Sequence, residues 1–79
     1  MNEYIYLSEL PTGKLGYVTS INAKQDMKQR LNDLGVVEGT EIKCIMKSPL
    51  GDPVAYLIRG SIIALRREDS ETITIALRG

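Results

Sequence analysis

Glycine and proline residues break this sequence into segments that are too short for long helices and well suited to short strands. Turn signals stand at Thr12-Gly13, at residues 38–40, at residues 49–53 and at Gly60. The intervals between them predict five strands, at residues 14–21, 41–47, 54–59, 62–66 and 72–77. Short strands at this spacing are typical of a small barrel, because closure of a sheet removes its exposed edges.

One segment has helical rather than strand periodicity. Met27, Leu31 and Leu34 recur at helical spacing, which predicts a helix over residues 23–34. Asn22 and Gln25 form a capping-box pair at its start, and Gly35 suits the left-handed residue that ends many helices. The whole chain is 79 residues long, enough for one domain. We therefore expect a mostly β fold, a small SH3-like five-stranded barrel with one inserted helix, in a single domain over residues 1–79.

The strand over residues 41–47 alternates between apolar and polar side chains. Ile42, Cys44 and Met46 should point into the core, with the charged side chains of the strand outside. Residues 67–71 are almost all charged or polar, which predicts a solvated turn before the last strand.

The overall charge and hydropathy exclude several classes of protein. Ten Lys and Arg balance ten Asp and Glu, so the chain has no general attraction for a polyanion. No stretch approaches the roughly 18 consecutive apolar residues of a membrane span. The first ten residues contain Glu3 and Glu9 and no basic segment, unlike a signal peptide. With a solitary cysteine, which forms no internal disulfide, we expect a cytoplasmic protein that does not insert into a membrane.

The residue type that most often acts as a general base is missing. The sequence has no histidine, so no Ser-His or Cys-His pair can form. The glycines stand at separate chain reversals and form neither a P-loop nor a GxGxxG pattern. We expect no catalytic residue, no cofactor and no enzyme activity.

Two binding alternatives remain open from the residues alone. Glu68, Asp69 and Glu71, or the thiol of Cys44, are weak candidates for a divalent metal site in a metal-sensing domain. A basic patch could instead bind RNA, as other SH3-like barrels do. Its members would be Arg66, Arg67, Lys43 and Lys47. Acidic neighbours and the lack of Phe and Trp for base stacking argue against nucleic acid.

Four segments together resemble a known family. They are LPTG at residues 10–13, RLNDLGVVEGT at residues 30–40, PLGDPVAY at residues 49–56 and GSIIALR at residues 60–66. Their order and spacing are similar to those of the ferrous iron transport protein A (FeoA) family, across nearly the whole chain. Similar barrels form the C-terminal domain of iron-dependent repressors, but this sequence has no helix-turn-helix segment before the barrel.

The resemblance implies an accessory protein of bacterial ferrous iron uptake. Its partner would be the cytosolic part of a membrane permease with a GTP-binding domain, ferrous iron transport protein B, which it would regulate by binding. We expect the contact surface at the helix end and at the 49–53 turn, because loops on a rigid scaffold often carry recognition. The candidate residues are Leu34, Gly35, Val37, Leu50, Gly51, Asp52 and Pro53. The alternative for each is a purely structural role at the helix end or in the turn, and the oligomeric state stays open.

Overall fold

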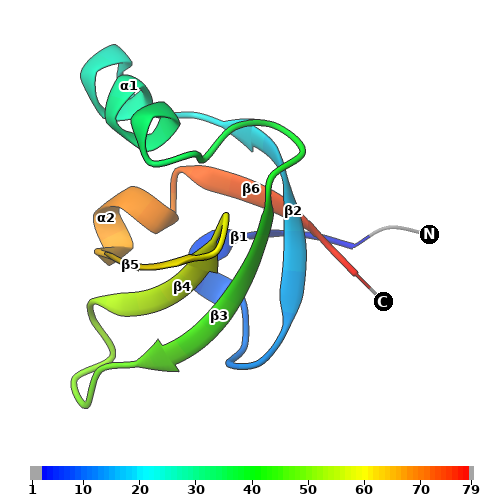
Figure 1. Ribbon diagram of the computed structural model, residues 1–79, viewed down its shortest axis with the longest axis vertical. Coiled ribbons are helices and arrows are strands. Elements are labelled where there is room, and N and C mark those ends of the chain that lie inside the picture. The colour runs from blue at the N-terminus through cyan, green and yellow to red at the C-terminus, as the bar shows by residue number, and fades with distance from the viewer. Residues whose placement is uncertain (1–2, 79) are drawn as a thin grey trace.

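The computed structural model describes residues 3–78, in which six antiparallel strands form one curled sheet (Figure 1). The strands are β1 (Tyr4–Tyr6), β2 (Leu15–Ile21), β3 (Glu41–Lys47), β4 (Val54–Ile58), β5 (Ser61–Leu65) and β6 (Ile73–Leu77). Their order across the sheet is β1-β6-β2-β3-β4-β5. A 3-10 turn, η1 (Leu7–Glu9), follows β1, and the helices are α1 (Gln25–Asp33) and α2 (Arg67–Ser70). The mostly β fold expected from the sequence is confirmed.

The expectation of five strands was wrong by one, because β1 was not foreseen. Tyr4 pairs with Ala76 and Tyr6 with Thr74, along the outer edge of β6. Both tyrosines are more than half exposed, and only Ile5 between them packs against the core. A strand of three residues with only one inward side chain is too short for the alternation of apolar and polar residues to be recognised in the sequence.

The core fills the inside of the barrel and is closed by η1 and α1. Leu7 on η1 and Leu31 on α1, together with Leu10 and Val36 just after these elements, are almost fully buried. Each such side chain contributes about 1.5–3 kcal/mol through burial. Tyr56, on β4, is also buried, and its hydroxyl donates to the Leu7 carbonyl at 3.4 Å. Burial raises the pKa of Tyr56 above its ordinary value.

A β-bulge in β3 changes which side chains face the core. Cys44 pairs with Tyr56, but the next paired residue is Met46, opposite Ala55, so Ile45 is an extra residue. Ile42 and Cys44 are buried as expected, whereas Met46 is 59% exposed, so its assignment to the core was wrong. The extra residue reverses the alternation of faces beyond it.

Helix α1 ends as the sequence indicated but begins differently. Val36 N donates to Leu31 O and Gly35 N to Asn32 O, both at 2.9 Å, and Gly35 has φ +93°. This is the Schellman arrangement that favours glycine. The Asn22 capping box was wrong, because Lys24 is the N-cap and no side chain caps the helix. The backbone N–H of Asn22 instead donates to Thr72 O at 2.7 Å, which ties Asn22 to the residue just before β6.

The polar segment before β6 is a short helix, α2, rather than a solvated turn. Asp69 and Ser70 are buried on its inner side. The carboxylate of Asp52 accepts a hydrogen bond from the Arg67 amide at 2.9 Å. That bond satisfies one of the free amides at the start of α2 and fixes the β3–β4 loop against it.

Candidate functional site

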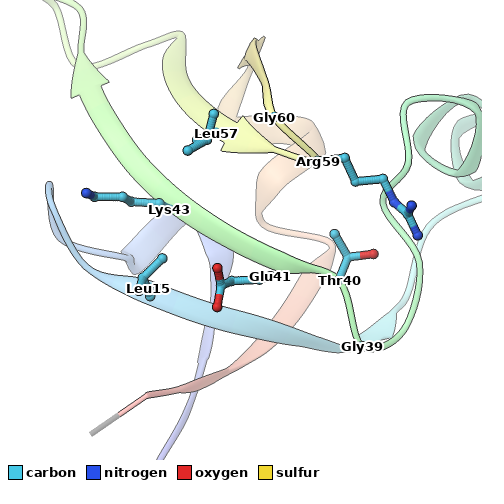
Figure 2. Close-up of a pocket in the computed structure, with 8 residues that line it drawn as sticks. All are labelled: Leu15, Gly39, Thr40, Glu41, Lys43, Leu57, Arg59 and Gly60. Atoms are coloured by element: carbon cyan, nitrogen blue, oxygen red, sulfur yellow. The ribbon is translucent and has the colours of Figure 1, made fainter.

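A groove of about 340 Å³ crosses the outer face of the sheet, beside the point where α1 ends (Figure 2). Leu15 on β2, Lys43 on β3 and Leu57 on β4 lie in one cross-strand row along its floor. The turn before β3 closes one side, and the β4–β5 turn closes another. The residues that line it are Leu15, Gly39, Thr40, Glu41, Lys43, Leu57, Arg59 and Gly60.

Arg59 adopts a backbone conformation that is uncommon for its residue type. It has φ +51° and Gly60 has φ +82°, and together they form the two-residue turn between β4 and β5. Such turns favour Asn-Gly or Asp-Gly, because both central residues need positive φ. Figure 2 shows the Arg59 side chain leaving the groove toward the helix end. Its Nε donates to the Gly35 carbonyl at 3.3 Å.

The same Gly35 carbonyl receives a second donor from Thr40. Thr40 Oγ1 donates to Gly35 O at 2.9 Å and accepts from Val37 N at 3.2 Å. A Cβ on Gly35 would stand 2.6 Å from Arg59 Cδ, so a side chain at position 35 would displace the Arg59 side chain from its bond to Gly35. The end of α1, the following turn and the β4–β5 turn are thus held together in one rigid unit. We call Gly35, Val37, Thr40 and Arg59 the corner.

Some of the charged side chains that line the groove are paired with an opposite charge and others are not. Glu41 Oε2 pairs with Arg78 Nη1 at 3.3 Å, and the same Nη1 donates to the hydroxyl of Tyr17 at 2.8 Å. Lys43 takes part in no ion pair within residues 3–78. The groove therefore offers two leucine side chains and two cations, Lys43 and Arg59, neither of which is in an ion pair within residues 3–78. This composition suits the binding of another molecule rather than bond making or breaking.

The structure divides the predicted partner-binding residues between two places. Leu34, beside the corner, and Val37, within it, are both exposed. Leu50 is 94% exposed at the tip of the β3–β4 loop, followed by residues 51–53. Figure 1 places α1 and this loop at opposite ends of the long axis of the molecule. The predicted residues therefore form two separate surfaces.

The weak metal candidates are also apart. Cys44 is completely buried in the core, where its thiol is 4.0 Å from the Thr12 hydroxyl. Asp69 is buried 3.8 Å from the Arg30 guanidinium. Glu68 and Glu71 are exposed on either side of it. Within residues 3–78, no three His, Cys, Asp or Glu side chains come together as metal ligands.

The basic residues considered for RNA binding do not share one hollow. Lys43 lines the groove, while Lys47 and Arg67 line a separate depression beside Tyr56. Sequence reasoning missed Arg59 and Thr40. An available signal for Arg59 was the Arg-Gly pair between two short apolar runs, where a tight hairpin turn expects Asn-Gly or Asp-Gly.

A six-stranded barrel with an outer groove and a rigid corner defines a small β-barrel binding domain. The FeoA domain model matches residues 5–77, and the chain therefore belongs to the FeoA domain family. This family is involved in ferrous iron transport. No helix within residues 3–78 has the length and apolar character needed to cross a membrane.

Individual relatives share both sequence and fold with this chain. It is 35% identical over 71 residues to a Fe(2+) transport protein A/Fe(2+) transporter FeoB fusion protein of Porphyromonas gingivalis, covering 90% of this chain but only 8% of the fusion protein. The solution structure of FeoA from Chlorobium tepidum is 37% identical with a TM-score of 0.89, covering 95% of this chain and 71% of that one. Stenotrophomonas maltophilia FeoA complexed with zinc, described as a procaryotic SH3 domain protein, is 29% identical with a TM-score of 0.79, covering 90% and 88% of the two chains. The barrel is thus SH3-like.

Proposed function

We propose that this protein acts in the cytoplasm by docking onto the transporter FeoB and biasing its conformational states. The fusion protein of Porphyromonas gingivalis carries the proposal, because a similar domain there shares one polypeptide with FeoB. Covalent linkage keeps two domains at a high effective concentration, which is useful when they bind each other. In this chain the same contact would form between separate molecules.

The docking surface that the geometry favours is the helix end beside the corner. Leu34 and Val37 present apolar surface there, 40% and 36% exposed. The hydrogen bonds of Thr40 and Arg59 to Gly35 hold the backbone between them, so little ordering is needed on binding. A rigid apolar surface that fits one state of a transporter better than another shifts its equilibrium by the difference in affinity. A coupling of about 1–3 kcal/mol is ordinary for such regulation.

The test is a calorimetric titration against the isolated cytosolic part of FeoB, without nucleotide, with GDP and with a non-hydrolysable GTP analogue. We expect binding whose strength depends on the nucleotide. Leu34→Asp should weaken it at least about tenfold, since an apolar contact at an interface centre is worth more than about 1.4 kcal/mol.

Leu50→Asp is the matched control. It makes the same chemical change on an exposed leucine at the other end of the molecule, and it should leave affinity unchanged. Loss of binding only in Leu50→Asp would move the surface to the β3–β4 loop. No binding in any nucleotide state would contradict the proposed function.

A further inference from the structure

Strand β5 (Ser61–Leu65) forms an open edge of the sheet. It pairs with β4 on one side, and no other strand within residues 3–78 pairs with it on the other. Its sequence, Ser-Ile-Ile-Ala-Leu, has no charge, proline or glycine. Edge strands are usually protected by such residues, or by a bulge, against pairing with another chain. β5 has none of these protections.

The register identifies which backbone groups of β5 are open. Ile58 and Ser61 flank the two-residue turn, and such a flanking pair is hydrogen-bonded across the hairpin. Because the pattern alternates along antiparallel strands, Ser61, Ile63 and Leu65 direct their amides and carbonyls toward β4. Ile62 and Ala64 direct theirs away from it. Two amides and two carbonyls therefore stand ready for a further strand.

The side chains beside this edge are apolar and exposed. Ile62 is 67% exposed and lies opposite Leu57, and Ala64 lies opposite Ala55. Ala55 in turn lies opposite Met46, which is 59% exposed because of the β3 bulge. An apolar surface on the outer face of β4 and β5, extended by Met46 on β3 and bordered there by Lys43, thus reaches the open edge.

The charges at the two ends of β5 indicate which kind of strand can pair with its open edge. Arg59 precedes the strand and Arg66 follows it, both exposed. A second copy paired antiparallel through Ile62 and Ala64 would bring Arg59 of each chain close to Arg66 and Arg67 of the other. Like charges at this distance oppose association, so self-pairing is disfavoured. Acidic residues at both ends of an incoming strand would instead complement these arginines.

We propose that the β5 edge binds an extended segment of another protein, apolar in its centre and acidic at both ends, as an added strand. Backbone hydrogen bonds to Ile62 and Ala64 provide the attachment, and the apolar face beside them accepts alternate side chains of the segment. This edge is separate from the helix end used in the proposed function, so either inference can fail while the other holds.

The experiment uses the full chain labelled with ¹⁵N and a short peptide of alternating valine and threonine with glutamates at both ends. We expect amide shifts centred on Ile62 and Ala64, and slower hydrogen exchange at both. A peptide with the same glutamates but prolines in place of the valines cannot form a strand, and it should not produce these changes. Equal shifts with both peptides would overturn the proposal, because they would reflect charge alone.

Ala64→Pro tests the backbone contact directly. Its lost amide points away from β4, so the β4–β5 ladder is kept, and proline is tolerated at such an edge position. Binding should fall at least about tenfold, whereas Ala64→Val, which keeps the amide, should bind as the parent chain does. If the spectrum shows that Ala64→Pro does not fold, Ile62→Lys serves instead, since a charge on the edge also blocks strand addition. Unchanged affinity in the folded blocking variant would overturn the proposal.

Arg66→Glu tests the chemistry of the occupant. Affinity for the glutamate-ended peptide should fall about threefold to tenfold, while a lysine-ended peptide should gain. Sedimentation of the chain alone provides the remaining comparison. A dimer that protects the Ile62 and Ala64 amides would show that a second copy of this chain occupies the edge. Larger shifts of these amides with an RNA oligonucleotide than with the peptide would show that RNA occupies it. Either result would overturn the proposal.

Discussion

Strand β4 lies between two very different hairpin connections, the β3–β4 loop before it and the β4–β5 turn after it. The β3–β4 loop projects from the molecule, with Leu50 94% exposed at its tip. The β4–β5 turn is only Arg59 and Gly60, and the Arg59 side chain is turned back onto the end of α1. The loop is attached through Asp52, which binds the α2 amide of Arg67, whereas the turn is attached through the corner around Gly35.

The difference lies in how firmly each turn is bonded to the rest of the fold. In the corner, the polar groups of Thr40, Arg59 and Gly35 satisfy one another, so changes there should mainly alter stability. At the loop tip the side chains touch little, so changes there should cost less stability than changes in the corner. Matched substitutions in the two turns measure this contrast.

The largest contrast is expected between Gly35→Ala and Gly51→Ala. Both glycines have positive φ, +93° and +84°, so alanine strains the backbone by about 1–2 kcal/mol at each. Only at Gly35 would the new Cβ also meet a neighbour, Arg59 Cδ at 2.6 Å; at Gly51 nothing lies within 4 Å. We expect Gly35→Ala to lower the free energy of unfolding by about 3 kcal/mol and Gly51→Ala by about 1 kcal/mol. Urea unfolding followed by circular dichroism measures both.

A double-mutant cycle isolates the steric part of the Gly35→Ala effect. With Arg59→Ala in the background, the neighbour is gone and only the backbone strain should remain. Equal destabilisation of Gly35→Ala in both backgrounds would contradict the close-approach argument.

Thr40→Val should cause the next largest loss, about 2 kcal/mol. Valine keeps the shape of the side chain but removes the hydroxyl that bonds to Gly35 O and Val37 N. Thr40 is only 7% exposed, so the groups left behind regain little solvent. Thr40→Ser keeps the hydroxyl and is the control. A loss in Thr40→Ser as large as that in Thr40→Val would mean that packing, rather than hydrogen bonding, stabilises the corner.

Whether an interaction in these two turns could be predicted depends on how far apart in the sequence its residues lie. The helix end at Gly35 was predictable, because the Schellman arrangement uses residues close in sequence. The β3 bulge was not, because the extra residue Ile45 is defined only by its pairing with β4. The bond from Arg59 to Gly35 joins residues 24 apart, and that from Asp52 to Arg67 joins residues 15 apart. Neither separation belongs to a local sequence motif. The corner and the attachment of the β3–β4 loop to α2 are therefore visible only in the folded structure.

Asp52→Ala should cost about 1 kcal/mol, less than Thr40→Val, since the carboxylate is exposed and its role resembles that of a helix cap. The β3–β4 loop should also become more mobile, visible as faster amide exchange at Arg67 and lower order parameters around Leu50. Asp52→Asn retains an acceptor oxygen and should recover most of the stability. Unchanged exchange at Arg67 in Asp52→Ala would show that other contacts hold the loop.

The smallest and most discriminating change is Arg59→Asn. Asparagine suits the positive φ of the first turn position, which should relieve backbone strain and stabilise the hairpin. The hydrogen bond from Nε to Gly35 O is lost, but it is exposed and Thr40 still satisfies that carbonyl. The two effects nearly cancel, so the free energy of unfolding should change by less than about 0.5 kcal/mol. Arg59→Ala, which gains no such turn preference, should be clearly less stable than Arg59→Asn. If the two variants unfold at the same urea concentration, the turn conformation carries no strain, and the β4–β5 turn is then held by the arginine side chain alone.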